Sequence, residues 1–211
     1  MLIINDSVNI SWLGLSSLRI NFRDKQIYID PYKVSGGSAD LILITHSHLR
    51  HLSVEDIKKL KKGNTIVCVP GDAGEIYDGG NIVVKPGVSF NLYSIPIQTT
   101  PAYNLSGKPY HPKSKKWVGY ILDLDGTKIY HAGDTDDIPE MKKLKVDVAF
   151  LPISGRSVMT AKKAAEIANK FKPPIAVPIH WDNSPNSLQD ASLFKKNYKG
   201  ESKILKPDLS L

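Results

Sequence analysis

A cluster of histidines directly follows a short apolar segment in the first quarter of the chain. Leu41–Ile44 leads into Thr45-His46-Ser47-His48-Leu49-Arg50-His51, so three of the six histidines of the chain lie within six residues. Side chains two apart in an extended segment project to the same side, which places His46 and His48 together at a strand end. His51 returns to the same place once the chain turns toward a helix. Imidazole nitrogens about 2.0–2.1 Å from one cation are typical of a zinc site. The alternative is a solvated, helix-initiating loop that is merely rich in histidine, and the triple spacing favours the metal site.

Three further candidate ligands follow other predicted strands, which is where sites form in layered α/β proteins. Asp134 lies in Tyr130-His131-Ala132-Gly133-Asp134-Thr135, where it is a hard anionic ligand able to bridge two cations. His180 follows the apolar segment 175–179, and His111 lies in the loop before Trp117. Each alone is compatible with a cap or a surface group. With the histidine cluster they supply five imidazoles and a carboxylate, which is enough for one cation and nearly enough for two.

The elements that must position these residues alternate between strands and helices. A helix is expected from Ser53, whose pairing with Asp56 resembles a capping box, to Gly63. Asp125-Gly126 is a strong two-residue hairpin signal. Strands are expected at 8–13, 17–22, 26–30, 41–44, 65–69, 82–85, 90–99, 117–124, 127–130, 146–151 and 175–179, and further helices at 138–144, 160–172 and 188–197. Two sheets with helices outside satisfy this order, which predicts a four-layer αββα sandwich.

Length and composition fit one folded domain over residues 1–211. No apolar stretch approaches the roughly 20 residues that span a bilayer, and no secretory signal opens the chain. The single cysteine, Cys68, excludes an intramolecular disulfide and is expected to be a buried apolar residue. We therefore expect a cytoplasmic protein without a membrane partner. The sequence does not give an oligomeric state.

The charge balance is basic, with 28 Lys and Arg against 21 Asp and Glu. Two interpretations remain open: a solvated lysine-rich face, or attraction of an anionic partner such as a phosphorylated small molecule or nucleic acid. Basic residues are not interleaved with aromatic ones, so nucleic acid is the less supported partner.

Taken together, the motifs resemble the metallo-β-lactamase fold. The resemblance rests on Thr-His-Ser-His-x-x-His at 45–51, Tyr-His-Ala-Gly-Asp-Thr-Asp at 130–136 and Pro-Ile-His at 178–180. It is closest to the branch of small metal-dependent hydrolases related to L-ascorbate-6-phosphate lactonase, and it covers nearly the whole chain. Further matching segments are Trp12-Leu13-Gly14, Ile29-Asp30-Pro31, Pro101-Ala102-Tyr103-Asn104, Leu151-Pro152-Ile153-Ser154 and Met159-Thr160. The motifs specify the fold and not the substrate, because this fold hosts lactonases, phosphodiesterases, thioesterases and nucleases.

The resemblance implies a two-part metal site. His46 and His48, with a third histidine and Asp134, would hold the first metal, and His51, His180 and the shared Asp134 would hold the second. Related proteins often have the third histidine just after a Pro-Ala strand end, where this chain has Asn104. His111 is the substitute that we predict, and His131 is expected to support the site without binding metal.

One residue departs from the family pattern His-x-His-x-Asp-His, because Arg50 occupies the position of the aspartate. A guanidinium has no lone pair to donate and stays positively charged, so it cannot ligate a cation. Arg50 can point away, occupy the place of the second metal and pair with Asp134, or reach into the cleft and bind an anionic substrate group. We favour a centre dominated by the first metal.

These observations predict a metal-dependent hydrolase of a small, anionic ester, lactone or phosphodiester. The metal would lower the pKa of bound water from 15.7 toward about 7 and polarise the scissile group. Asp134 would anchor the cation and hold the hydroxide, which makes it the predicted catalytic residue. Zinc, as one or two ions, is the first expectation, and manganese or iron also suits such ligands. The residues expected to contact substrate are Arg50, Asn104, Lys108 and Lys113.

Two alternatives compete with the hydrolase. A catalytically silent binding protein is favoured by Arg50 and opposed by the intact histidines and Asp134. A nuclease ranks lowest, because RNA-processing relatives of this fold carry an inserted domain for which this chain has no room.

Overall fold

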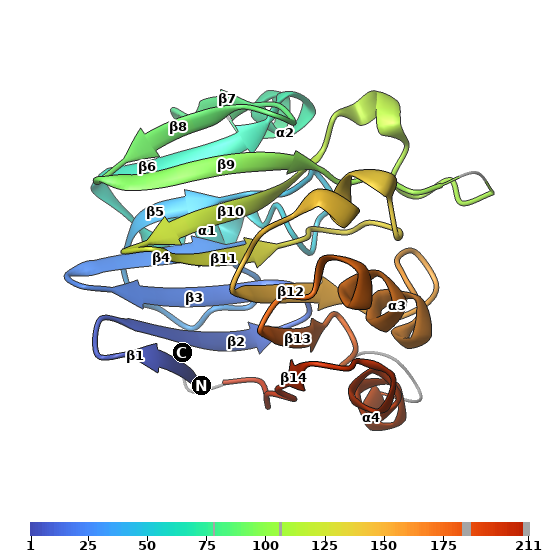
Figure 1. Ribbon diagram of the computed structural model, residues 1–211. Coiled ribbons are helices and arrows are strands. Elements are labelled where there is room, and N and C mark those ends of the chain that lie inside the picture. Colours follow the sequence, from blue (N-terminus) through green and yellow to red (C-terminus); the bar gives the residue numbers. More distant parts are fainter. Residues whose placement is uncertain (78, 106, 183–186, 209–211) are drawn as a thin grey trace. The chain divides into compact units, whose positions relative to one another are not determined.

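The chain divides into two compact units. The computed structural model describes residues 1–77, 79–105, 107–182 and 187–208. The first unit comprises Met1–Val84 with Leu205–Leu211, and the second comprises Lys85–Ile204. Within the described residues, each unit contains one seven-stranded sheet (Figure 1). A single domain over residues 1–211 stays a prediction.

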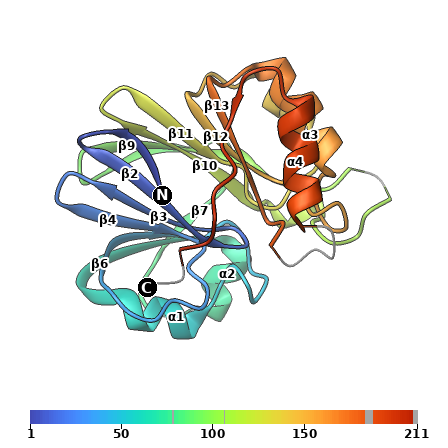
Figure 2. The same ribbon diagram turned by 90° about the horizontal axis from the view of Figure 1, so that it is seen from below.

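The sheet of the first unit is antiparallel at one end and parallel at the other. Strands β1 to β4 form an antiparallel meander, and β4 to β7 pair in parallel. Helix α1 connects β5 to β6, helix α2 connects β6 to β7, and both lie on one face of this sheet (Figure 2). The elements are β1 (Leu2–Asn5), β2 (Val8–Gly14), β3 (Ser17–Phe22), β4 (Lys25–Ile29), β5 (Ala39–Leu43), α1 (Val54–Leu60), β6 (Lys61–Pro70), α2 (Gly71–Ile76) and β7 (Ile82–Val84).

Helix α1 begins where the capping pattern predicts it. The Ser53 hydroxyl accepts a hydrogen bond from the Asp56 backbone N–H at 3.3 Å, which satisfies one of the first amides of the helix. Ile57 and Leu60 pack with Tyr28 in a buried apolar cluster, which fixes the helix on its sheet. The expected end at Gly63 is wrong, because Lys61 already has extended backbone and pairs with Ala39 at the start of β6.

The sheet of the second unit is also mixed. Strands β8 to β11 are antiparallel, and β11 to β14 are parallel. Helix α3 crosses from β12 to β13, and α3 and α4 lie along the same side of this sheet (Figure 2). The elements are β8 (Ser89–Leu92), β9 (Ile95–Pro101), η1 (Lys113–Lys115), β10 (Val118–Leu124), β11 (Thr127–His131), η2 (Pro139–Lys143), β12 (Val148–Pro152), α3 (Ala161–Phe171), β13 (Ile175–Ile179), α4 (Ser187–Asn197) and β14 (Glu201–Ser202).

Two hairpins organise the antiparallel half of this sheet. Asp125 and Gly126 both have positive φ, 55° and 85°, as the predicted two-residue turn between β10 and β11 requires. The single strand expected over 90–99 is instead the hairpin of β8 and β9. Tyr93 and Ser94 turn the chain with φ of 52° and 62°, and neither is the Gly, Asn or Asp that predicts a two-residue turn with positive φ.

Strands β9, β10 and β11 approach closely at Gly119. A Cβ at this position would lie 2.7 Å from the His131 carbonyl oxygen and 2.7 Å from Thr100 Oγ1. It would also lie 2.9 Å from the Ala132 carbonyl oxygen. Glycine therefore permits the packing at the end of β11, directly before the segment that carries Asp134.

Two sequence expectations about burial and length can be checked directly. Cys68 is fully buried, and burial raises the pKa of its thiol to about 12, which agrees with an apolar rather than a nucleophilic role. Among the described residues, none of the helices has the length and apolar character that a membrane crossing requires.

Candidate metal centre

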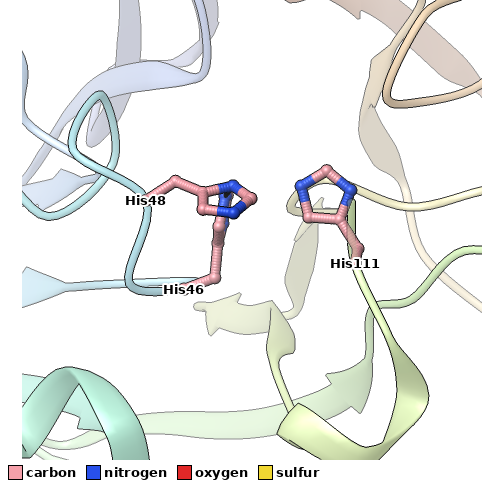
Figure 3. A group of neighbouring side chains, drawn as sticks. All are labelled: His46, His48 and His111. Carbon is pink, nitrogen blue, oxygen red and sulfur yellow. Dashed lines mark hydrogen bonds between the residues drawn. The ribbon is translucent and has the colours of Figure 1, made fainter. Parts of the chain in front are cut away.

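The histidine cluster of the first unit follows β5 as the sequence predicts. His46 and His48 extend from the segment after this strand (Figure 3). His46 and His51 are buried, at 1% and 2% exposure, whereas His48 is exposed. The rings of His46 and His51 lie with centroids 3.9 Å apart. The turn that brings His51 back is closed by a 2.8 Å hydrogen bond from its N–H to the carbonyl of His48.

A buried carboxylate orients two of these imidazoles. Asp30 Oδ2 lies 2.8 Å from His51 Nδ1, so this nitrogen carries a proton, and the neutral ring has its lone pair on Nε2. Thr45 Oγ1 donates its only proton to Asp30 Oδ2 at 2.6 Å. The same hydroxyl lies 2.9 Å from His46 Nδ1 and therefore accepts from it, which also leaves the lone pair on His46 Nε2. Asp30 thus sets both rings in the tautomer that binds a cation through Nε2.

Sequence reasoning did not select Asp30 as a site residue. It is fully buried, it has a left-handed φ of 48°, and it also accepts the Thr45 backbone N–H at 2.7 Å. The available signal was the carboxylate in Ile29-Asp30-Pro31, at a strand end within the family pattern.

The spacing of His46 and His48 fits a shared cation. His46 Nε2 lies 3.1 Å from His48 Nδ1. Ligand atoms about 2.0–2.1 Å from a tetrahedral zinc ion lie about 3.3 Å from each other. These two nitrogens therefore already have close to the separation that two zinc ligands need.

Arg50 lies at the surface of the same loop. Its side chain is exposed, and in the part of the chain that the structure describes it has no hydrogen bond or ion pair. The neighbouring Leu49 is 77% exposed. The Arg50 guanidinium is therefore accessible to an anion.

The second unit contributes a carboxylate between two imidazoles. Asp134 Oδ2 lies 3.5 Å from His111 Nε2 and 3.3 Å from His180 Nε2. Asp134 and His111 are buried, at 4% and 1% exposure, while the His180 side chain is 15% exposed. Both distances match the ligand-to-ligand edge of about 3.3 Å around a tetrahedral ion. A single carboxylate oxygen thus lies at ligand spacing from two ring nitrogens.

His111 is oriented by Asn104, the residue at the position where relatives often have histidine. Asn104 Oδ1 accepts the His111 backbone N–H at 3.0 Å and lies 3.1 Å from His111 Nδ1. The Ser157 carbonyl oxygen lies 3.1 Å from the same ring nitrogen. Because both neighbours are acceptors, Nδ1 carries a proton, and Nε2 is the nitrogen that faces Asp134 and holds the lone pair in the neutral ring. His111 extends from the segment between β9 and η1 (Figure 3).

The turn before Asp134 is held by His131 and Gly133. His131 Nδ1 accepts the Gly133 N–H at 3.1 Å, and Gly133 has a left-handed φ of 64°. His131 is fully buried, and it supports this turn as expected. His180 also has a left-handed φ, 59°, directly after β13.

The two lysines predicted to contact substrate have partners inside the second unit. Lys108 Nζ contacts Asp136 Oδ1 at 2.6 Å. Lys113 Nζ lies 3.3 Å from the Tyr103 hydroxyl and 3.4 Å from Glu140 Oε1, and these two partners raise the pKa of Lys113. Their contact with substrate stays a prediction.

Comparisons with known proteins identify the family of this chain. A family model described as the β-lactamase superfamily domain matches residues 9–180. A UPF0173 metal-dependent hydrolase of Thermococcus onnurineus is 33% identical, over 95% of this chain and 97% of its own length. A homologue of the same description from Pyrococcus furiosus is 32% identical, over 97% and 99% of the two chains.

Two solved structures superpose on this chain over more than nine tenths of its length. A crystal structure of a Parabacteroides distasonis protein superposes with a TM-score of 0.86 at 32% identity, covering 93% of this chain and 92% of the other. The metallo hydrolase Igni18 of Ignicoccus hospitalis has a TM-score of 0.77 at 24% identity, with 95% of both chains covered.

Proposed function

Because the chain belongs to the β-lactamase superfamily and is a metal-dependent hydrolase, we propose that it cleaves a small anionic ester, lactone or phosphodiester. The family match over residues 9–180 and the likeness to the Parabacteroides structure confirm the predicted fold. It is the metallo-β-lactamase fold, an α/β sandwich built from two mixed sheets and helices. A small-molecule substrate follows from this family, and its charge and identity are the proposed part.

The proposed ligands come from both units. His46, His48, His111 and Asp134 would bind the first cation, and His51, His180 and Asp134 would bind the second. The observation that carries this proposal is that an oxygen acceptor lies at Nδ1 of three histidines. In His46, His51 and His111, this oxygen accepts the hydrogen bond of Nδ1–H, so Nε2 is the ligand nitrogen. An imidazole held only as part of a solvated loop needs no such orientation.

The donor set favours zinc over the other cations. Five imidazoles with one carboxylate suit Zn²⁺, while Mn²⁺ and iron also accept histidine and carboxylate ligands. When bound, such a cation lowers the pKa of a water molecule toward about 7 and polarises the scissile carbonyl or phosphoryl oxygen.

The side chains have the remaining tasks. Asp134 is nearly fully buried, so its negative charge is weakly screened and can both attract a cation and accept a hydrogen bond from the attacking water. Asp30, directly and through Thr45, and Asn104 hold the Nδ1 protons of His51, His46 and His111, which leaves Nε2 of each neutral ring as the ligand nitrogen. Arg50 is the strongest candidate among the four predicted substrate contacts. Its guanidinium is exposed and can bind an anionic group in a bidentate fork.

A cytoplasmic location stays a prediction from the sequence.

A panel of hydrolysis assays tests the proposal. The protein is freed of metal with a chelator and assayed on bis-p-nitrophenyl phosphate, a simple lactone and a p-nitrophenyl ester, before and after addition of Zn²⁺ or Mn²⁺. We expect at least one activity to vanish with the chelator and to return with metal. Loss of a residue that only orients a ligand typically costs about 10–100-fold, so His111→Ala and Asp134→Ala should each cost more. Activity that persists without metal would refute the proposal.

The same assays distinguish a hydrolase from a binding-only protein, which is the main alternative. A binding-only protein, which the Arg50 substitution favours, would bind Zn²⁺ and hydrolyse none of the three substrates faster than free Zn²⁺ does. Hydrolysis of single-stranded RNA alone would favour the nuclease.

The presence of Arg50 in place of aspartate leads to a separate prediction about the number of metal ions. Because a guanidinium cannot donate a lone pair, the second cation lacks the carboxylate that the family pattern supplies. We expect one tightly bound Zn²⁺ per chain in the unmodified protein and close to two in Arg50→Asp, measured by elemental analysis after dialysis. Two tightly bound ions in the unmodified protein would contradict this.

A further inference from the structure

Lys108 lies in the segment that carries His111, and its side chain binds two other segments. Its ammonium contacts Asp136 Oδ1 at 2.6 Å and donates to the Val158 carbonyl oxygen at 2.7 Å. The Lys108 side chain is 31% exposed, and the Asp136 side chain is 8% exposed. An ammonium has three donors, so two of the three are used within the protein.

Asp136 links this segment to the turn that carries Asp134. It lies two residues after Asp134, and its Oδ2 accepts the Leu105 N–H at 3.0 Å. Its own N–H donates to the Tyr103 carbonyl at 3.0 Å. Both the carboxylate and the backbone of Asp136 therefore hold the chain on either side of Asn104.

Val158 links Lys108 to the other support of His111. Val158 follows Ser157, whose carbonyl oxygen accepts from Asn104 Nδ2 at 2.9 Å and lies 3.1 Å from His111 Nδ1. The Lys108 ammonium thus joins three segments that determine where His111 lies. These are its own segment, the turn after Asp134, and the pair Ser157-Val158.

We propose that Lys108 is a positioning residue and not a contact of the substrate. It holds His111 Nε2 and Asp134 Oδ2 at the spacing of two ligands of one metal ion. This inference rests on the proposed metal site. Moving the ammonium to a substrate would leave the buried Asp136 carboxylate without its cation, and an uncompensated buried charge is strongly unfavourable. In a positioning role, by contrast, Lys108 keeps its contacts with Asp136 and Val158.

Zinc affinity without substrate tests the proposal. Equilibrium competition with a chromophoric chelator gives the Zn²⁺ dissociation constant of the unmodified protein and of Lys108→Met, Lys108→Arg and His111→Ala. Lys142→Met, which removes an exposed lysine of η2, is the matched control. We expect Lys108→Met to weaken Zn²⁺ binding about 10–100-fold, as loss of other orienting residues does. Lys108→Arg should recover most of the affinity, and Lys142→Met should bind as the unmodified protein does.

A spectroscopic readout separates positioning from a general loss of structure. Long-range ¹H–¹⁵N NMR of the imidazoles reports the His111 tautomer, and the Nδ1–H signal should weaken in Lys108→Met but persist in Lys142→Met. If Lys108→Met does not fold, Asp136→Asn removes the same ion pair and is expected to weaken Zn²⁺ binding in the same way.

The outcomes distinguish this inference from the proposed function. Unchanged Zn²⁺ affinity in Lys108→Met, with a raised KM for an anionic substrate, would refute the positioning role of Lys108. Lys108 would then be a substrate contact. Unchanged affinity in His111→Ala would instead overturn the proposed metal site itself.

Discussion

At the scale of single residues, the site depends on which ring nitrogen of each histidine carries the proton. Thr45, His51 and the backbone at Thr45 all donate toward Asp30, so this carboxylate acts only as an acceptor. Its buried charge therefore does two things: it orients the rings, and it makes them better ligands. The site is prepared by residues that need not touch the cation.

Asp30→Asn tests this role. An amide keeps the shape of the carboxylate but offers one acceptor oxygen and one donor, so a donor of Thr45 or His51 loses its acceptor. We expect Zn²⁺ affinity to fall about 10–100-fold while the fold is retained. The measurement is chelator competition, with Asp24→Asn in the exposed turn before β4 as the control. Equal affinities in the two variants would show that Asp30 does not prepare the site.

The sequence predicted the candidate ligands better than their supports. His46, His48 and His51 are close in sequence, and Asp134 and His180 follow strands, so spacing and periodicity locate them. Asp30 and Lys108 act on residues 15 to 50 positions away along the chain. Such contacts leave no local pattern, and lysine charge alone suggested a substrate contact where the structure has an internal ion pair.

At the scale of elements, most of the proposed ligands follow the ends of strands, and the second unit has a close contact at one of these ends. Gly119 in β10 is such a contact with backbone, because a Cβ there would meet the carbonyl oxygens of His131, which ends β11, and of Ala132, which follows it. Backbone atoms cannot move aside as a flexible side chain can. The turn that carries Asp134 therefore depends on a residue without a side chain in the neighbouring strand.

Gly119→Ala should destabilise the second unit and disturb Asp134. Forced overpacking of this kind costs about 1–3 kcal/mol of the free energy of unfolding. Gly63→Ala is the matched control, because nothing lies within 4 Å of its added Cβ and its φ is not positive. Chemical denaturation followed by circular dichroism gives both values. A loss in Gly119→Ala no larger than that in Gly63→Ala would disprove the close-packing argument.

Most elements could be predicted from apolar periodicity, and the exceptions have physical causes. Helix α3 agrees with its predicted range because Thr160 caps it and a left-handed Lys172 ends it before Pro173. Helix α2 was not expected, since it has six residues and no side-chain cap at Pro70. The segment at 138–144 forms a 3-10 helix, η2, and not an α-helix.

At the scale of the whole molecule, the sequence predicted the fold but not the substrate. Motifs spread over the chain identify the metallo-β-lactamase fold, because each is tied to a strand end of that architecture. The substrate depends on loop side chains, which follow no regular pattern, and exposed Arg50 is the contact that we propose.

We propose that side chains from both units bind the same ions, and anomalous scattering from a crystal grown with Zn²⁺ is the decisive measurement. The map should contain one strong peak about 2.0–2.2 Å from ligand atoms of His46, His48, His111 and Asp134. A second peak beside His51 and His180 should be weaker, with Arg50 directed away from it. A map in which zinc is bound by residues of one unit alone, or by neither unit, would refute the proposed centre.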